Sequence, residues 1–450
     1  MTSARAVARD VLVRVEAGAY SNLVLPEALR RSELATRDRA FATDLVYGTL
    51  RAQRRLDGLL APHSRQDLDG LEPVVRALLR LGAYQLLHDV AVHAAVGETV
   101  AAAPPRARGY VNAVLRSLAA SGPPWPEPTT VGAALSYPDW VVGRLTADLG
   151  TGDARRALEA ENEPPLVTLR PNPRRTDADA LAAELTASGA RVTRGGLVLD
   201  AVAVRGAGDP GALPAVQEGR ATPQDAASQA VVALVDARAG DVALDVAAAP
   251  GGKATGLGER VGAGVVAAVD AHARRLGRVR DAARRLGLQN VWPVLADGRA
   301  LPIADASVDR ALVDAPCSGL GVLRRRPEAR WRVGEPTPEL VALQVGLVLG
   351  AAATVRPGGR LVYSVCTLTA AETAGVATSV VGQLAGRFRV GERPGPPWRP
   401  AGPGALILPQ DAGTDGMFVL VLDRTGTSGR APGAARGSGE HDEAADSVRA

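Results

Sequence analysis

The chain has 450 residues, of which 46% are hydrophobic and 22% are charged. Since a domain takes roughly 100–200 residues, this composition predicts a folded protein of several domains and argues against wholesale disorder. The 52 basic and 48 acidic side chains leave a net charge of +4, which by itself does not indicate a nucleic-acid partner. No apolar run reaches the roughly 18 residues that span a bilayer, and the first residues lack the apolar core of a secretory signal. We expect a cytoplasmic monomer that does not enter a membrane.

Few side chains carry distinctive chemistry. Lys253 is the only lysine, and it lies in a glycine-rich stretch. Because the other basic residues are all arginines, we expect this lysine to have a functional role. Cys317 and Cys366 are the only cysteines, which excludes a secreted fold held by several disulfides. The five histidines do not combine with the cysteines at the spacing of zinc ligands, so we expect no metal site.

The N-terminal part has a helical pattern. Val7, Val11 and Val15 fall on one helical face, and the pattern predicts an all-helical domain over residues 1–120. A proline-rich break follows at residues 121–128. Residues 129–220 combine a helical segment with β-like pieces in LVTLRPN and GLVLDAVAV, which predicts a small α/β connecting module.

The pattern changes after residue 221. Short β-rich runs alternate with helical stretches, which predicts βαβ units and a mostly parallel sheet. The expected strands are VALDVA, GVVAAVD, VWPVLAD, RALVDAP, RLVYSVC and MFVLVLD. We place a catalytic domain at 221–423, and the polar composition of residues 424–450 predicts a disordered tail.

A cofactor site is expected where the first of these strands ends. The strand passes into a loop of small residues and then a helix, so backbone could approach a ligand at the carboxyl end of the sheet. The next strands end near Asp270 and Asp297, which suit ribose hydroxyls and an adenine amino group. The alternative is that such acids only cap the following helices. The loop lacks G-x-G-x-x-G, which disfavours a nicotinamide or flavin cofactor.

Both cysteines follow predicted strands on the same edge of the sheet. Cys317 comes after RALVDAP, and Cys366 ends RLVYSVC. If these strands pair, they lie about 4.8 Å apart, and both sulfurs could reach one small substrate. The alternative is that both are buried, inert side chains. Two thiols at such a site suit 5-methylation of cytosine, because a thiolate added at C6 makes C5 able to accept a methyl group.

The C-terminal half contains the segments QDAASQ, DVAAAPGGK, DAPCSGLGVLRRRPEARW, VYSVCTLTAAE and DGMFVLVL. With them the chain resembles the bacterial ribosomal RNA cytosine-5 methyltransferases of the Sun/Fmu (RsmB) type. RDRAFATDLVYGTLR, HAAVGETV and YVNAVLRSL resemble the N-terminal domain of that family. The resemblance covers residues 4–423. It implies an α/β fold, in which a NusB-like all-α RNA-binding domain and the connecting module precede a class I Rossmann-like methyltransferase domain.

The resemblance also implies a cofactor and its contacts. The cofactor would be S-adenosylmethionine, with Asp270 holding its ribose and Asp297 its adenine. The loop that contacts it would consist of Ala247, Ala248, Ala249, Pro250, Gly251, Gly252 and Lys253. Ala247 stands where the family often has cysteine, so that side chain is not essential to the chemistry.

Catalytic roles are implied in the same way. Cys366 would be the nucleophile, Cys317 would promote product release, and Asp314 would lie between cofactor and target base. The residues alone do not choose between the cysteines, since DNA cytosine methyltransferases attack from a Pro-Cys motif. The presence of the second cysteine marks the RNA type.

The expected substrate is a cytosine of small-subunit (16S) ribosomal RNA. Two alternatives remain: a transfer RNA cytosine-5 methyltransferase, or a non-catalytic NusB-like RNA-binding or antitermination factor. Several arginines follow the Pro-Cys motif and could hold RNA phosphates, or could form a solvated face instead. They are Arg324, Arg325, Arg326, Arg330 and Arg332.

Overall fold

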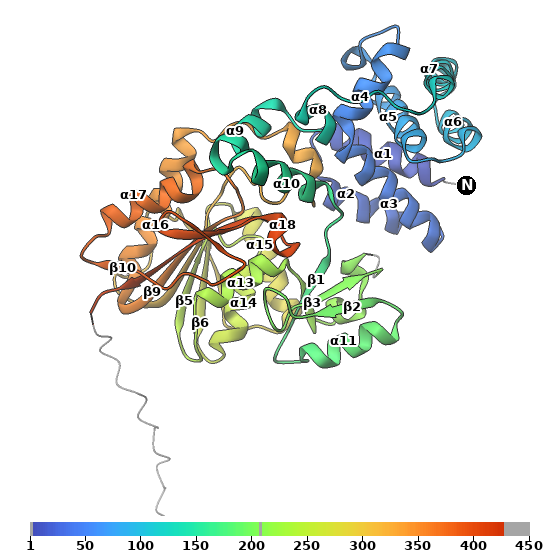
Figure 1. Ribbon diagram of the computed structural model, residues 1–450. Coiled ribbons are helices and arrows are strands. Elements are labelled where there is room, and N and C mark those ends of the chain that lie inside the picture. The colour runs from blue at the N-terminus through green and yellow to red at the C-terminus, as the bar shows by residue number, and fades with distance from the viewer. Residues whose placement is uncertain (1–2, 207–208, 427–450) are drawn as a thin grey trace, which may run out of the picture.

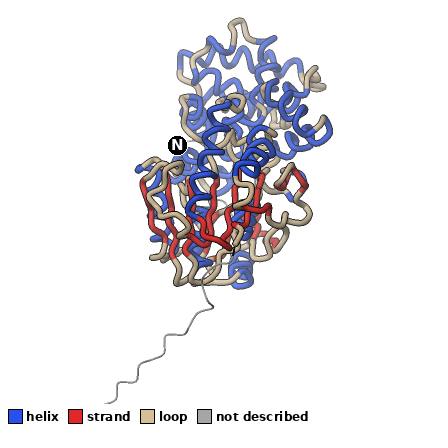
Figure 2. Tube along the Cα trace, turned by 90° about the vertical axis from the view of Figure 1, so that its left-hand side faces the viewer, coloured by secondary structure: helices blue, strands red, loops and turns tan. Residues whose placement is uncertain are grey.

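The computed structural model describes residues 3–206 and 209–426. A bundle of helices at the N-terminal end stands over a large mixed sheet, and a small sheet lies beside both (Figure 1). Helices dominate one end of the molecule and strands the other (Figure 2). Within the described ranges, no helix is long and apolar enough to cross a membrane.

The N-terminal bundle is all-helical, as predicted. Val7, Val11 and Val15 face its core, and the apolar α5 passes through the middle of that core. Its helices are α1 (Ala4–Glu16), α2 (Ser21–Arg31), α3 (Thr36–Arg51), α4 (Gln53–Leu60), α5 (Pro73–Leu87), α6 (Val92–Ala101) and α7 (Arg108–Ser121).

The small sheet is four-stranded and antiparallel, in the order β2-β3-β1-β4. Helix α11 (Ala178–Ala187) contributes to a separate small core with it. The strands are β1 (Val167–Pro171), β2 (Arg191–Arg194), β3 (Val202–Arg205) and β4 (Ala221–Pro223). The strand predicted in GLVLDAVAV is confirmed only at β3. Gly195 and Gly196 adopt φ angles of 79° and 91°, so the chain turns there instead of remaining extended.

The large sheet has nine strands among the described residues, in the order β11-β12-β13-β9-β8-β5-β6-β7, with β10 paired to β13. The predicted parallel part is confirmed: β7, β6, β5, β8 and β9 run parallel. Beyond β9 the strands are antiparallel, and short β10, β11 and β12 were not predicted. The strands are β5 (Val242–Val246), β6 (Val265–Asp270), β7 (Val291–Leu295), β8 (Val308–Asp314), β9 (Val355–Val365), β10 (Phe388–Val390), β11 (Arg399–Ala401), β12 (Gly404–Ile407) and β13 (Met417–Arg424).

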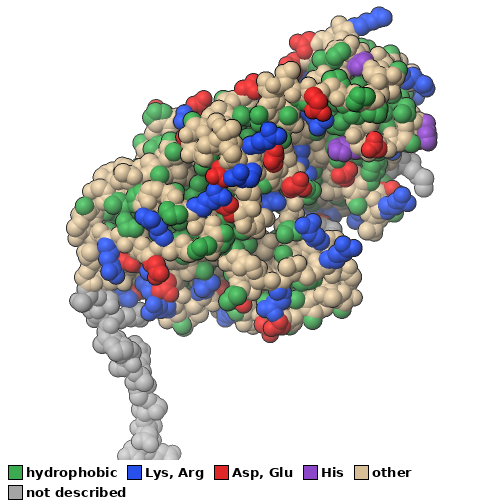
Figure 3. Space-filling model, in the orientation of Figure 1, with side chains coloured by type: hydrophobic (Ala, Val, Ile, Leu, Met, Phe, Trp, Pro, Cys, Tyr) green, Lys and Arg blue, Asp and Glu red, His purple; other side chains and the backbone are tan. Residues whose placement is uncertain are grey.

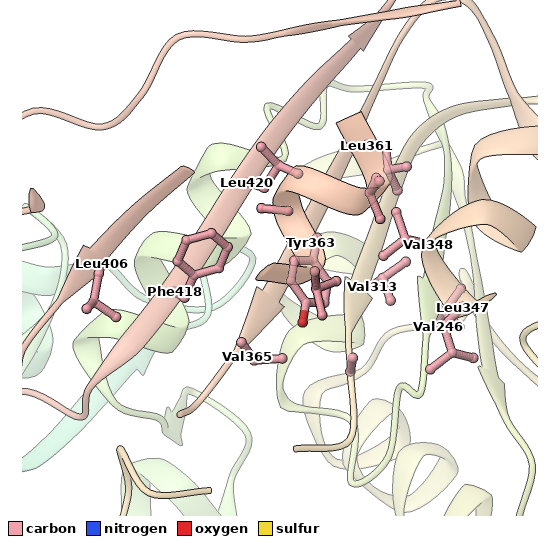
Figure 4. Close-up of a cluster of buried hydrophobic side chains, with 14 of the residues drawn as sticks. Val246, Val313, Leu347, Val348, Leu361, Tyr363, Val365, Leu406, Phe418 and Leu420 are labelled. Atoms are coloured by element: carbon pink, nitrogen blue, oxygen red, sulfur yellow. The ribbon is translucent and has the colours of Figure 1, made fainter. Parts of the chain in front are cut away.

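Helices pack on both faces of this sheet. One face is covered by α13 (Ala226–Leu234), α14 (Gly252–Val261) and α15 (Ala273–Leu286). The other is covered by α16 (Pro338–Thr354), α17 (Val376–Gln383), α9 (Asp139–Leu149) and α10 (Thr151–Asn162). Figure 4 shows the centre of this second core, where Tyr363 and Phe418 meet edge-on at 6.2 Å between ring centroids. Short helices α8 (Val131–Leu135), α12 (Pro214–Gln217) and α18 (Pro409–Ala412) complete the set.

This packing helps to decide where the domain boundaries of the chain lie. Helices α9 and α10 share their core with the large sheet, although they precede the small sheet in sequence. We propose that they are better grouped with the catalytic domain than with the connecting module. The tail expected at 424–450 lies outside the described residues after position 426, and Arg424 still belongs to β13.

The helical bundle is held by the segment that follows Cys317. The Glu328 carboxylate accepts hydrogen bonds from the Ser21 N–H at 2.9 Å and its hydroxyl at 2.8 Å, and so caps the first turn of α2. The Arg332 guanidinium donates to the carbonyls of Val15, Gly18 and Ala19, where α1 ends. An acid at a helix N-terminus and a base at a helix C-terminus both favour the helix dipole. The segment therefore binds the α1–α2 turn at both the end of α1 and the start of α2.

We expect Glu328→Gln to weaken the attachment of the bundle to the sheet, because a neutral amide replaces the charged carboxylate that accepts two hydrogen bonds from Ser21. Hydrogen bonds to charged groups contribute about 1.5–3 kcal/mol. Limited digestion of the full-length protein with a protease of broad specificity, such as proteinase K, should cut the link at residues 121–128 and its surroundings faster in the variant. Glu335→Gln, at an exposed acid, is the control. Equal digestion of Glu328→Gln and wild type would mean that this contact does not hold the bundle.

A second buried acid lies beneath the same segment. Glu161 is 1% exposed and accepts the backbone N–H of Arg324, while Arg330 stacks 3.8 Å from the centroid of the Tyr137 ring. Burial raises the pKa of Glu161 to about 8, the Asp415 charge adds to the rise, and the Arg324 contact opposes it.

This pKa predicts a pH-dependent stability. From about pH 4.5, where the unfolded carboxyl titrates, up to about pH 8 the folded protein keeps a proton that the unfolded chain has released. Stability therefore falls as pH rises through that window and levels off above it. Glu161→Gln removes this titration, so its thermal midpoint should rise relative to wild type from pH 5 to about pH 8. A difference that stays constant with pH would contradict the raised pKa.

Candidate active site

The loop between β5 and α14 has an unusual backbone. Ala247 adopts a φ of 61° and Gly251 a φ of 109°, both in the left-handed region. A Cβ on Gly251 would lie 3.0 Å from the Val279 Cα, so only glycine lets α15 approach this closely. The Ala248 N–H donates to the Val269 carbonyl at 2.9 Å, which ties the loop to the end of β6. The predicted loop thus forms a fixed turn at the carboxyl edge of the sheet.

Arg170 supports this loop from the small sheet. It forms a bidentate ion pair with Glu259 at 2.9 and 3.0 Å and donates to the Gly252 carbonyl at 2.7 Å. A further bond reaches the Thr255 hydroxyl at 3.0 Å. Arg170 therefore attaches the first turn of α14 to β1, a role that no motif in the sequence indicates.

The predicted ribose and adenine acids lie at neighbouring strand ends. Asp270 is 3% exposed, and its carboxylate accepts the N–H groups of His272 at 3.0 Å and Ala249 at 3.3 Å. Asp297 is more exposed and binds Arg299, whose side chain and backbone N–H lower the pKa of Asp297 to about 2. Each acid thus accepts the N–H of the residue two positions later, but neither caps a helix, because the N-cap of α15 is His272 and no helix directly follows Asp297. Asp270 also contacts the loop through the Ala249 N–H.

Asp245, inside β5, is a site residue that the sequence analysis did not single out. It is 0% exposed, and neither carboxylate oxygen has a hydrogen-bond partner among the described residues. Burial raises the pKa of Asp245 well above its usual range, and the Asp314 charge adds to the rise. A buried carboxyl without a partner is costly. An acid inside an otherwise apolar strand was the available signal.

The only lysine meets Asp314 across the site. The Lys253 Nζ donates to the Asp314 Oδ2 at 2.7 Å, and the Ser364 hydroxyl donates to the Oδ1 at 2.8 Å. Burial alone would lower the pKa of Lys253, but the charges of Asp314, Cys366 and Asp245 hold it above the usual value. The ammonium group therefore stays charged between the loop and the end of β8.

The two thiols lie next to each other. Strands β8 and β9 pair in parallel with Asp314 opposite Ser364, so the residues that follow them share one edge, as predicted. The Cys317 and Cys366 Sγ atoms are 3.4 Å apart, and both side chains are partly buried. The hydrogen bond to Cys366, burial, and the charges of Cys366, Glu372 and Asp314 raise the pKa of Cys317 well above its usual range. The charge of Cys366 also contributes to the raised pKa of Lys253.

Two of the five arginines expected at RNA phosphates are buried inside the protein instead. Arg330 is 0% exposed and donates to the Ser136 carbonyl and Asn162 side chain, and Arg324 donates to the carbonyls of Gly413 and Thr414. These contacts satisfy backbone and amide oxygens that burial would otherwise leave unpaired.

The remaining three are engaged as well. Arg325 pairs with Asp225 at 2.8 Å and Asp415 at 2.7 Å. Arg326 and Arg332 both lie against the Tyr20 ring. Arg324, Arg325 and Arg330 therefore hold the protein together, whereas the side chains of Arg326 and Arg332 remain exposed. On the face in Figure 3, basic side chains are interspersed with acidic ones.

Comparison with known proteins places this geometry in a family. Residues 232–423 match the profile of 16S rRNA methyltransferase RsmB/F, residues 137–209 its ferredoxin-like domain, and residues 2–120 the NusB family. A probable ribosomal RNA small subunit methyltransferase B of Bacillus subtilis is 32% identical over 94% of this chain and 99% of its own. The chain belongs to this methyltransferase family. The Vibrio vulnificus ribosomal RNA small subunit methyltransferase B is 33% identical over 93% and 98%.

Solved structures agree on the fold. The crystal structure of PH0851 superposes with a TM-score of 0.82 at 24% identity, covering 94% of this chain and 99% of that one. NSun6 from Pyrococcus horikoshii, solved with SFG, gives 0.57 at 21% identity, covering 64% of this chain and 99% of its own. The family membership makes the protein an RNA methyltransferase whose cofactor is S-adenosylmethionine.

The residues present suit that cofactor. The loop up to Gly252 carries only small side chains, and left-handed backbone at Ala247 and Gly251 fixes its turn. The Asp245 carboxyl, which has no hydrogen-bond partner among the described residues, lies two positions before it. When bound, the cofactor supplies an electrophilic methyl group on a sulfonium. We propose that the loop from Ala247 to Lys253 cradles it, with Asp270 and Asp297 on its nucleoside.

Asp270→Ala should weaken cofactor binding. It removes a carboxylate proposed to hold ribose and also releases the Ala249 N–H that fixes the loop. The loss of one charged hydrogen bond, about 1.5–3 kcal/mol, corresponds to roughly a 10- to 150-fold lower affinity in calorimetry. Asp281→Ala, at an exposed acid of α15, should bind like wild type. Undiminished affinity in folded Asp270→Ala would place the ribose elsewhere.

Proposed function

We propose that the protein methylates C5 of a cytosine in small-subunit ribosomal RNA through a covalent bond between Cys366 and C6. The observation that carries this proposal is the pair of thiols 3.4 Å apart, at the ends of β8 and β9 and beside the Lys253–Asp314 ion pair. Two thiols within reach of one small ring suit a reaction in which one sulfur attacks and the other assists release. The target base must leave its stack to reach them.

Cys366 is the better nucleophile of the two. The Lys253 ammonium places positive charge near Cys366, whereas Glu372 and Asp314 place negative charge near Cys317 and raise its pKa. Addition of the Cys366 thiolate to C6 moves the electron pair of the C5–C6 bond toward C5, which can then take the methyl group. The ring then carries a bond to sulfur at C6 and both a proton and a methyl group at C5.

Release requires the C5 proton to leave. Its bonding pair then re-forms the C5–C6 double bond and expels Cys366 as a thiolate. Once Cys366 is bound to carbon, it offers Cys317 a weaker hydrogen bond and carries no charge, so two of the influences that raise the pKa of Cys317 are reduced. The acidity of Cys317 therefore increases at the stage when a base is needed. In this reaction order, Cys366 makes the attack and Cys317 assists the release.

Two readings of the sequence remain as outcomes of the test. A transfer RNA substrate would keep the chemistry and change only the RNA. A non-catalytic RNA-binding factor would not need two thiols in contact, a paired lysine and a tightly turned loop in one place. These features favour an enzyme, and the names of the relatives favour ribosomal RNA.

The two cysteine variants should fail differently. Cys366→Ala removes the attacking atom, so methyl transfer and covalent complex should both vanish. Cys317→Ala leaves the attack intact but removes the group that assists release, so enzyme and RNA should remain linked. Denaturing electrophoresis after incubation with small-subunit ribosomal RNA and S-adenosylmethionine should show a slow-migrating complex for Cys317→Ala alone.

The controls separate the alternatives. The double variant should form no complex, and neither should Cys317→Ala without RNA. A complex in Cys366→Ala instead would reverse the two roles. The same assay with transfer RNA, followed by mapping of 5-methylcytosine, tests the substrate. Methylation of transfer RNA alone would overturn the ribosomal assignment.

A further inference from the structure

Glu372 is a buried acid that lies between the two cysteine loops. It belongs to the short turn Ala371–Gly375 after β9, and it is 0% exposed. We propose that Glu372 is a positioning residue that holds the Cys317 and Cys366 loops together and so fixes the separation of the two thiols. The catalytic part of this inference rests on the proposed function, whereas the positioning itself does not.

The carboxylate binds the residues that follow both cysteines. Its Oε1 accepts the Ser318 backbone N–H at 2.8 Å, and its Oε2 accepts the Ser318 hydroxyl at 2.6 Å. The Oε2 also lies 3.4 Å from the Thr367 hydroxyl, which is itself 2.7 Å from the Ser318 Oγ. Ser318 adjoins Cys317 and Thr367 adjoins Cys366. One side chain therefore connects the two loops directly.

Neighbouring residues hold Glu372 in turn. The Tyr363 hydroxyl donates to the Glu372 carbonyl at 2.7 Å, and Figure 4 shows this tyrosine rising from the sheet core. The Gln344 amide donates to the Glu372 Oε1 at 3.1 Å and to the Pro316 carbonyl at 2.9 Å. The Thr369 hydroxyl donates to the Oε2 at 2.8 Å. The sheet and α16 thus fix both the acid and the chain before Cys317.

Every contact of the carboxylate is with a donor. An ionised carboxylate accepts at both oxygens, so it can satisfy all of them at once. Glutamine has the same shape but replaces one oxygen with an NH₂ group. If its oxygen stays on the Ser318 N–H and the Gln344 amide, the NH₂ group meets the Ser318 and Thr369 hydroxyls, which donate to the carboxylate in the native site and would have to rotate to accept. Glu372→Gln therefore weakens the link between the loops without opening a cavity.

Oxidation of the thiols measures their separation directly. Diamide takes one hydrogen from each thiol: two S–H bonds break, one S–S bond forms, and the N=N bond of the reagent is reduced to a hydrazine. Disulfide formation needs the sulfurs to approach to about 2.05 Å, so its rate depends on how well the loops are aligned. The assay uses the full-length protein without RNA or cofactor, and thiol titration with mass spectrometry follows it.

We expect wild type to form the intramolecular disulfide readily and Glu372→Gln to form it at least about tenfold more slowly, since small displacements of reacting groups have large effects on rate. The lost charge works in the opposite direction, because removing a carboxylate makes thiolates easier to form. Slowing therefore reports position and not acidity. Glu184→Gln, on α11 beside the small sheet, changes a glutamate bound to Arg220 and should oxidise like wild type. Equal rates for wild type and Glu372→Gln would overturn the proposal.

Catalysis supplies the second measurement. A misplacement of about 1 Å can cost about 100-fold, so kcat of Glu372→Gln should fall by that order while the KM for S-adenosylmethionine stays within about twofold. Ser318→Ala removes one contact and keeps the acid, so it should show a smaller loss in both assays. It also keeps the test open if Glu372→Gln does not fold. A rise in the cofactor KM with unchanged oxidation would assign Glu372 to cofactor binding and overturn the proposal.

The two proposals can fail separately. If wild type methylates no cytosine, the proposed function is wrong, but the oxidation rates still decide whether Glu372 positions the thiols. If wild type is active and both variants oxidise and methylate like wild type, only the positioning role is wrong.

Discussion

The parallel pairing of β8 with β9 is the constraint on which the site depends. Asp314 and Ser364 lie opposite each other, so the chain leaving each strand starts from one edge and the two thiols come within 3.4 Å. A shift by one residue would point every side chain of the strand to the other face and remove this arrangement. The cores on the two faces of the sheet fix that register, because Tyr363 and Val362 are buried on opposite sides.

The segment after Cys317 connects the thiol site to the helical bundle. It bears a thiol at one end and binds the helical bundle at the other, through Glu328 and Arg332. The charges that span this route are almost all engaged with backbone groups or with opposite charges. Since buried charges without partners are costly, this arrangement favours one relative placement of bundle and sheet. The bundle is thereby attached to the active-site loop and not only to the linker before the sheet.

The sequence was informative where local pattern decides structure. Apolar runs bounded by small residues located the parallel strands, and both cysteines followed at their ends. The sequence was uninformative where the role of a side chain depends on contacts with residues far away in the chain. Glu372 stands in a turn and acquires its role only through Ser318, and Asp245 looked like part of an apolar strand. The sequence also did not separate Arg324, Arg325 and Arg330, which bind within the protein, from the exposed Arg326 and Arg332, because composition does not show which arginines find partners.

The single lysine has a practical consequence. Reagents that acylate primary amines can modify only the chain terminus and Lys253, and the side chain of Lys253 is 13% exposed and bound to Asp314. The chain thus carries a built-in single-site reporter at the junction of the cofactor loop and the thiols. The degree to which the Lys253 amine is protected from acylation would report how much of the active site is occupied by ligand, without any engineered label.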